Sequence, residues 1–93
     1  MVIFISGPMT GFPNSNREAF NEQERILQEQ GHVVLNPAWH PDGLEHSQYI
    51  HMCLAEIDVA DAIYQLPGWE NSKGAKIEFD YALSKGKTIL QGR

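Results

Sequence analysis

Glu78 is the residue whose surroundings in the sequence most favour chemistry. It lies in the stretch LPGWENSKGAKIEFDYA, from Leu66 to Ala82. If this stretch forms a helix, Gly74, Ala75 and Ala82 share a face with Glu78, so that residues with almost no side chain frame its carboxylate. This arrangement leaves room for a ligand to approach the carboxylate. The alternative is a glutamate on an ordinary, partly solvated helix surface.

Two local signals place Glu78 just beyond the end of a strand. The short apolar run from Ala62 to Leu66 predicts a buried strand, which Pro67-Gly68 ends. Ser72 can cap a helix that begins at Lys73, because its hydroxyl can accept a hydrogen bond from a free backbone N–H. Open α/β sheets bind ligands at the carboxyl ends of their strands. The sequence therefore predicts that Glu78 lies at a ligand-binding edge.

A second candidate is the loop SGPMTG, which follows an apolar strand from Val2 to Ile5. The Thr10 hydroxyl and the backbone of Gly7, Pro8 and Met9, with N–H groups at Gly7 and Met9, could bind a ribose or a phosphate. The loop is neither G-x-G-x-x-G nor a P-loop, and Gly7-Pro8 could simply turn the chain. We favour ligand contact, because Thr10-Gly11 extends the loop beyond what a turn needs.

The histidines and the cysteine have ordinary structural interpretations. Zinc sites need closely and regularly spaced ligands, and the histidine spacing does not provide them. We therefore expect solvated loop histidines and no metal. Cys53 lies in the middle of a predicted helix without a basic neighbour, so a small buried hydrophobic role is favoured over a reactive thiol. The histidines are His32, His40, His46 and His51.

Trp39 and Trp69 both lie in loops at the expected mouth of the pocket. An aromatic face there could stack on a nucleobase. It could equally cap the core or lie at a subunit interface, and the sequence does not separate these alternatives.

Composition limits the classes of function. A chain of 93 residues, of which 42% are hydrophobic, predicts a single globular domain over residues 1–93. The net charge of −5 and the absence of a Lys/Arg cluster argue against a nucleic-acid polymer as partner. A small nucleotide is still compatible, because backbone N–H groups can hold a phosphate. No cofactor is indicated.

The same composition bears on location. No apolar run approaches the roughly 20 residues that a membrane span needs, so we expect no membrane partner. The single cysteine cannot form a disulfide within the chain, and the N-terminus lacks a basic leader. We therefore expect a cytoplasmic protein.

The order of the predicted elements indicates the fold class. Strands alternate with helices, which predicts a doubly wound, flavodoxin- or Rossmann-like α/β fold with a four-stranded parallel sheet, order 2-1-3-4, and helices on both faces. Helices are expected to begin at a Ser15–Glu18 capping box, at a Ser47 cap and at the Ser72 cap. The loops at residues 6–14, 36–45 and 67–72 open at one edge and form the expected pocket walls. The predicted strands are Val2 to Ile5, His32 to Leu35, Asp61 to Leu66 and Thr88 to Leu90.

Two segments carry a family resemblance. IFISGPMTG near the start and ADAIYQLPGWENSKGAKIE further on together resemble the nucleoside 2-deoxyribosyltransferase-like superfamily, and within it a small, often phage-borne branch. The resemblance extends from Val2 to Leu90. It implies cleavage of the N-glycosidic bond of deoxynucleosides or their monophosphates, with Glu78 in the position of the glutamate nucleophile. Ser72 and Gly74 resemble the loop that contacts the sugar or its 5′ substituent.

Three positions depart from the superfamily pattern. Pro8 and Thr10 stand where monophosphate-cleaving relatives carry a serine and an arginine. Cys53 stands where relatives usually have an aspartate that positions the sugar and the leaving group, and a thiol does not reproduce the hydrogen bonding of a carboxylate.

These departures leave more than one function open. The resemblance favours N-glycosidic bond cleavage or deoxyribosyl transfer on a nucleoside or nucleotide. Cys53 favours the alternative, a non-catalytic module that binds or sequesters a nucleotide, and a third hypothesis is a purely structural interaction protein. Relatives often complete each site with the C-terminal end of a neighbouring subunit. We therefore expect a homodimer or a larger homo-oligomer, with Gln91 to Arg93 as the candidates for that contribution.

Overall fold

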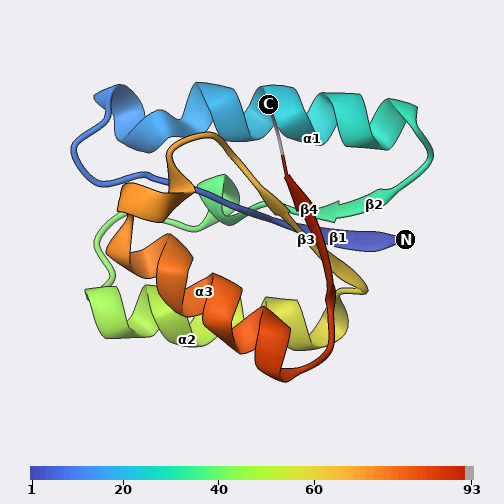
Figure 1. Cartoon of the computed structure of the whole chain (residues 1–93). Helices are drawn as coiled ribbons and strands as arrows, with labels where there is room; N and C mark the ends of the chain where they lie inside the picture. The colour runs from blue at the N-terminus through green and yellow to red at the C-terminus, as the bar shows by residue number, and fades with distance from the viewer. Residues whose placement is uncertain (92–93) are drawn as a thin grey trace.

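A four-stranded parallel sheet forms the centre of the chain, with the strand order β2-β1-β3-β4 (Figure 1). The computed structural model describes residues 1–91. All three strand pairs are parallel, so the predicted strand order 2-1-3-4 is confirmed. The strands are β1 (Val2–Ser6), β2 (Val33–Leu35), β3 (Ala62–Gln65) and β4 (Thr88–Gln91).

The helices cover both faces of this sheet. Helix α1 (Arg17–Glu29) lies on one face, and α2 (His46–Val59) and α3 (Lys73–Ser84) lie side by side on the other (Figure 1). This arrangement confirms the doubly wound α/β class. Within residues 1–91, no helix combines the length and the apolar composition needed to cross a bilayer. Three short 3-10 segments connect the elements: η1 (Pro13–Asn16), η2 (Pro37–Trp39) and η3 (Trp69–Asn71).

Strand β1 divides the core into two layers. Successive strand side chains point to opposite faces of the sheet. Ile3 and Ile5 accordingly pack with Phe20 of α1, whereas Phe4 packs with Ile57 of α2. Ser6 follows Phe4 in this alternation, so its buried side chain points toward α2 and α3. The pleat of β1 therefore directs a hydroxyl to the face that carries Glu78.

The predicted start of the first helix is wrong. Ser15 does not cap it, because Asn14, Ser15 and Asn16 have φ values of 50°, 55° and 62°, in the left-handed region, and α1 begins at Arg17 without a side-chain cap. An N-cap needs extended backbone angles, which this turn excludes. The Asn16 amide instead donates a hydrogen bond of 2.8 Å to the Pro8 carbonyl. The turn is thereby tied to the first loop.

The other two helix starts give one correction and one confirmation. Ser47 does not cap α2, because the helix begins at His46 with Glu45 as its N-cap, two residues earlier than predicted. The Glu45 N–H donates to the Gln48 side chain at 2.9 Å. Ser72 does cap α3, since its hydroxyl accepts a hydrogen bond from the Ala75 N–H at 3.2 Å. The helix that carries Glu78 therefore begins where the sequence predicts.

Candidate functional site

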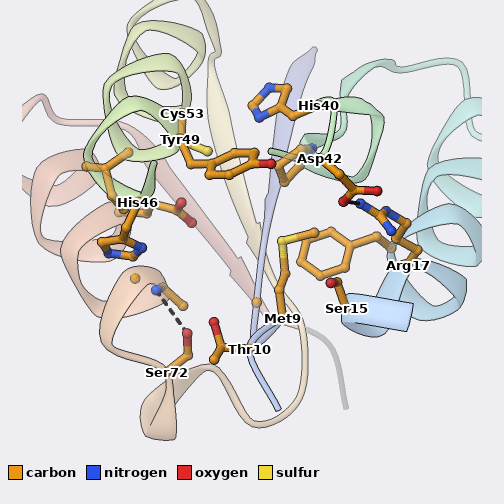
Figure 2. A pocket seen from close by; sticks show the side chains of 17 residues that line it. Met9, Thr10, Ser15, Arg17, His40, Asp42, His46, Tyr49, Cys53 and Ser72 are labelled. Atoms are coloured by element: carbon orange, nitrogen blue, oxygen red, sulfur yellow. Dashed lines mark hydrogen bonds and ion pairs between the residues drawn. The ribbon is translucent and has the colours of Figure 1, made fainter. Parts of the chain in front are cut away.

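A cavity of about 220 Å³ lies where the loops after β1 and β2 meet the helices (Figure 2). These loops leave the carboxyl ends of the strands, which is where doubly wound sheets bind ligands. All three helices also contribute to the wall. Six of the predicted site residues line the cavity: Gly7, Met9, Thr10, Ser72, Gly74 and Glu78.

Two other predicted site residues lie away from the cavity wall. The Trp69 ring stacks on Phe79, with 4.6 Å between ring centroids and an interplanar angle of 30°. Pro8 is buried behind the loop, next to Gly68. Trp39 is 74% exposed and borders a separate hollow. The two tryptophans are therefore not positioned to stack on a ligand in this cavity.

Sequence reasoning missed several side chains of the wall. Phe20 and Tyr49 supply aromatic surface to the cavity, and Arg17 supplies a cation. Arg17 donates to Asp42 at 2.5 Å and so links α1 to the loop after β2. No local signal marks these residues as part of one site, because they lie on two helices, α1 and α2, that meet around the cavity only after folding.

Glu78 is held in a defined position beside this cavity. Its side chain is on the buried face of α3, between Ala75 and Ala82, and it is 7% exposed. The Ser6 hydroxyl donates a hydrogen bond of 2.5 Å to Glu78 Oε1 (Ser6 is at the end of β1). Within residues 1–91 the carboxylate faces neither bulk water nor a cation, and the small residues beside it leave space.

Burial controls the protonation of Glu78. Removal from water raises its pKa to about 7, and the negative charge of Glu56 adds to this rise. The hydrogen bond from Ser6 acts in the opposite direction, because it stabilises the ionised form, and the neighbouring Cys53 thiol acts in the same way as Ser6. Near neutral pH, Glu78 can therefore exist in both protonation states.

Cys53 lies at the same place in the fold. It is 5% exposed and packs in the core with Phe4 and Ile57, so the predicted burial is confirmed. Burial raises the pKa of its thiol, and the carboxylates of Glu78 and Glu56 raise it further. The thiol is therefore protonated at neutral pH. Cys53 also lines the cavity beside Glu78, which agrees with the position that the family resemblance gave it, in place of an aspartate of the relatives' site.

The expectation of solvated loop histidines is wrong for His40. Its side chain is only 8% exposed, and its Nε2 lies 3.0 Å from a carboxylate oxygen of Glu56. His46 and His51, by contrast, are exposed. The loop after β2 folds back on α2, which removes His40 from solvent.

Gln91 to Arg93 are the residues predicted to complete the site of a neighbouring subunit. Gln91 is exposed at the end of β4. Gly92 and Arg93 lie outside the described residues, so the role expected for them stays a prediction.

We expect Ser6→Ala to raise the pKa of Glu78. Hydrogen bonds to charged groups contribute roughly 1.5–3 kcal/mol, which corresponds to an upward shift of roughly one to two pKa units. The pH dependence of unfolding, compared between Ser6→Ala and wild type, measures this shift. An unchanged pH dependence would show that the hydroxyl does not stabilise the carboxylate.

Gly7 and Gly74 both line the cavity but should respond differently to alanine. A Cβ at Gly7 would lie 2.7 Å from Leu66 Cβ, whereas one at Gly74 would meet no atom closer than 3.8 Å. We expect Gly7→Ala to lower the free energy of unfolding by roughly 1–3 kcal/mol through overpacking. Gly74→Ala should leave stability unchanged or raise it by up to about 1 kcal/mol, because alanine favours helix.

Denaturant unfolding measures both effects of these alanine variants. If the two variants had the same free energy of unfolding, the proposed clash between a Cβ added at Gly7 and Leu66 would be contradicted. Gly74→Ala further serves as a folded variant whose added methyl group narrows the approach to Glu78, so ligand binding should weaken without loss of stability.

Comparisons with known proteins agree with this architecture. The structure of a 2-desoxiribosyltransferase from Leishmania mexicana superposes with a TM-score of 0.78, at 22% sequence identity, over 97% of this chain. The chain spans 62% of the length of that protein. At this identity, the likeness establishes a shared fold. No curated protein sequence is significantly similar to the chain.

A family model gives the assignment. The model described as "Domain of unknown function (DUF4406)" matches residues 1–91, which is nearly the whole chain. The cavity, the buried glutamate and the doubly wound sheet described above are therefore features of a member of this family, and the chain belongs to the DUF4406 family.

Proposed function

We propose that this protein cleaves the N-glycosidic bond of a nucleoside or nucleotide, or transfers its deoxyribosyl group to a second base, with Glu78 as the nucleophile. The observation that carries the proposal is the position of Glu78, a buried carboxylate oriented by Ser6 at the wall of a cavity. The fold shared with a 2-desoxiribosyltransferase supports it. The membership of a small, often phage-borne branch, the cytoplasmic location and the homodimer or larger assembly stay predictions.

The proposed chemistry uses the ionised carboxylate of Glu78. One carboxylate oxygen attacks the anomeric carbon of the sugar as the C–N bond breaks, and the bonding electrons leave with the base. The result is an ester between Glu78 and the sugar, which water or a second base then resolves. The Ser6 hydrogen bond orients the carboxylate and favours its ionised form.

The sugar end of the substrate would lie between the first loop and the start of α3. Thr10 and Ser72 place hydroxyl groups on this part of the wall (Figure 2). The N-terminus of α3 adds free backbone donors and a dipole that favours an anionic or hydroxyl 5′ end. Gly74 leaves the path to Glu78 open, because it has no side chain to fill it.

Cys53 supports the alternative, a nucleotide-binding or sequestering module without turnover. Its thiol lies beside Glu78 and is protonated at neutral pH, so it cannot share the work of a carboxylate. A pKa of about 7 also leaves a large share of Glu78 protonated near neutral pH, where it is not nucleophilic. Both features are compatible with binding and unfavourable for fast turnover.

Release of free base distinguishes the two proposals. The wild-type protein is incubated with a panel of deoxynucleosides, their 5′-monophosphates and NAD, and the products are separated by chromatography. Release of a base supports glycosidic cleavage. Thermal stabilisation by a panel member without base release supports the binding module, and the absence of both contradicts both functions.

A further inference from the structure

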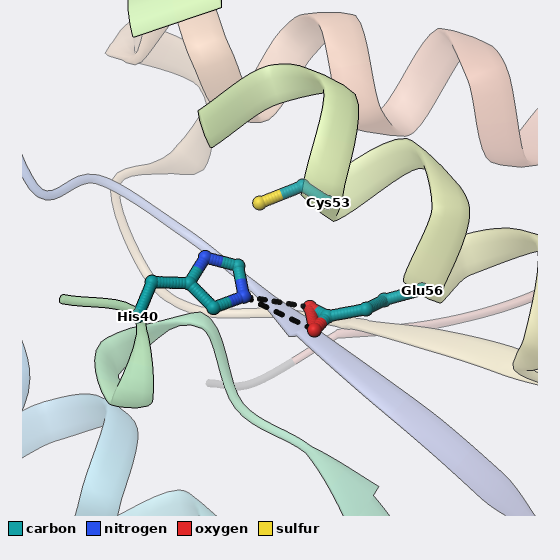
Figure 3. Close-up of side chains that lie close together, drawn as sticks. All are labelled: His40, Cys53 and Glu56. Atoms are coloured by element: carbon teal, nitrogen blue, oxygen red, sulfur yellow. Dashed lines mark hydrogen bonds and ion pairs between the residues drawn. The ribbon is translucent and has the colours of Figure 1, made fainter. Parts of the chain in front are cut away.

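His40, Cys53 and Glu56 form a cluster of three metal-ligating side chains next to the cavity (Figure 3). One ligand atom from each residue lies within 4.8 Å of the other two. Cys53 and Glu56 are three residues apart on α2, so they share a helix face, and His40 reaches them from the loop after β2. Figure 3 shows the three side chains converging on one space. Folding, and not sequence spacing, brings them together.

We propose that this cluster binds a divalent transition-metal ion of the Zn²⁺ class. Thiolate, imidazole and carboxylate are the three protein ligands that Zn²⁺ uses. With three protein ligands the ion keeps a fourth position, as catalytic zinc sites do. His40 and Cys53 also line the cavity, so that position would be open to a water or a ligand group there. The inference does not depend on glycosidic chemistry.

The distances between the ligand atoms require only small adjustments. Tetrahedral Zn²⁺ with the usual bond lengths holds N and O ligands roughly 3.4 Å apart and N and S ligands roughly 3.6 Å apart. His40 Nε2 is already 3.0 and 3.1 Å from the two Glu56 oxygens. Cys53 Sγ lies within 4.8 Å of the other two ligand atoms, so it has to approach by about 1 Å, which a small rotation about the Cα–Cβ bond of Cys53 can provide.

The charges around the cluster favour a cation at this place. The His40 side chain is 8% exposed, so little water screens these charges. Glu56 and Glu78 both act on Cys53 with negative charge. A divalent ion would compensate these charges. On binding, the metal–sulfur bond replaces the S–H bond and the thiol proton leaves to solvent, so the cluster loses one proton for each ion bound.

Titration of the chelator-treated protein with Co²⁺ alone tests the proposal. Cys53 is the single cysteine of the chain, so a sulfur-to-cobalt charge-transfer band can arise only from this residue. We expect the band to saturate at one Co²⁺ per chain and to disappear when Zn²⁺ is added. Absence of the band in wild type overturns the proposal.

Three variants and a matched control define the site. Cys53→Ser should remove the band, and Glu56→Gln and His40→Gln should weaken Co²⁺ binding by more than the roughly 10- to 100-fold that loss of an outer-shell partner costs. His51→Asn changes an exposed histidine of the same helix and should bind as wild type does. Circular dichroism checks folding of each variant. Equal weakening by His51→Asn and Glu56→Gln, or a band that survives Cys53→Ser, overturns the proposal.

Discussion

Glu78→Gln is expected to reduce base release by roughly 10³-fold or more, because loss of a nucleophile removes the covalent step altogether. Glutamine keeps the size of the side chain and can still accept the Ser6 hydrogen bond, so the fold and the cavity should persist. The measurement is the rate of free-base release under saturating substrate, with whichever panel member the wild-type protein cleaves. Substrate binding by the variant, followed by thermal shift, should survive.

Asp80→Asn is the matched control for this variant. Asp80 lies two residues further along α3 and is exposed, so its replacement removes a carboxylate of the same helix without touching the cavity. It should cleave at the wild-type rate. Equal rates for Glu78→Gln and wild type would exclude Glu78 as the nucleophile. The wild-type rate should also rise with pH and be half-maximal near the Glu78 pKa of about 7, since only the ionised form attacks.

The second large effect is on stability. Above about pH 8, Glu78→Gln should have a higher free energy of unfolding than wild type, because the variant has no buried charge. Relative to the difference between the two proteins at about pH 4, this advantage of the variant should be about 3 kcal/mol larger. The physical cause is the burial that raises the pKa of Glu78 from 4.5 to about 7. Denaturant unfolding of both proteins across this pH range measures the difference.

The sign of this effect follows from proton binding. Below pH 4.5 the carboxyl is protonated in the folded and the unfolded chain alike, and it carries no penalty. Between pH 4.5 and about 7 the unfolded chain loses the proton first, so wild-type stability falls as pH rises, and the loss is complete above the folded-state pKa. Asp80→Asn should not alter this pH dependence. If the free energies of unfolding of Glu78→Gln and wild type changed in parallel with pH, the pKa of Glu78 would be the same in the folded and unfolded chain.

The two effects have a common origin. A carboxylate that is favourable for catalysis is unfavourable for folding when it is buried, and strained or destabilised groups of this kind are often found at functional sites. A variant that gains stability at high pH while it loses base release would link both properties to the same atoms.

Several parts of the fold are determined by local sequence. A few neighbouring residues are enough to predict the strands β1 and β3 from their apolar runs and the start of α3 from the Ser72 cap. The structure confirms these predictions. The start of α1 could not be predicted in this way, because the Ser15–Glu18 motif says nothing of the left-handed turn at Asn14 to Asn16, where Asn16 donates a hydrogen bond to the Pro8 carbonyl earlier in the same connection. A capping motif states a local preference, which a contact from outside the motif can override.

The candidate site likewise has features that follow from local sequence and features that do not. Its position at the carboxyl edge of the sheet, and the small residues around Glu78, follow from element order and helix periodicity, both of which the sequence alone determines. The hydrogen bond from Ser6 to Glu78 joins residues 72 positions apart, and His40 meets Cys53 and Glu56 only where a loop folds back on a helix. Only the tertiary structure decided these contacts, because they depend on how the elements pack, and no short segment of sequence records that packing.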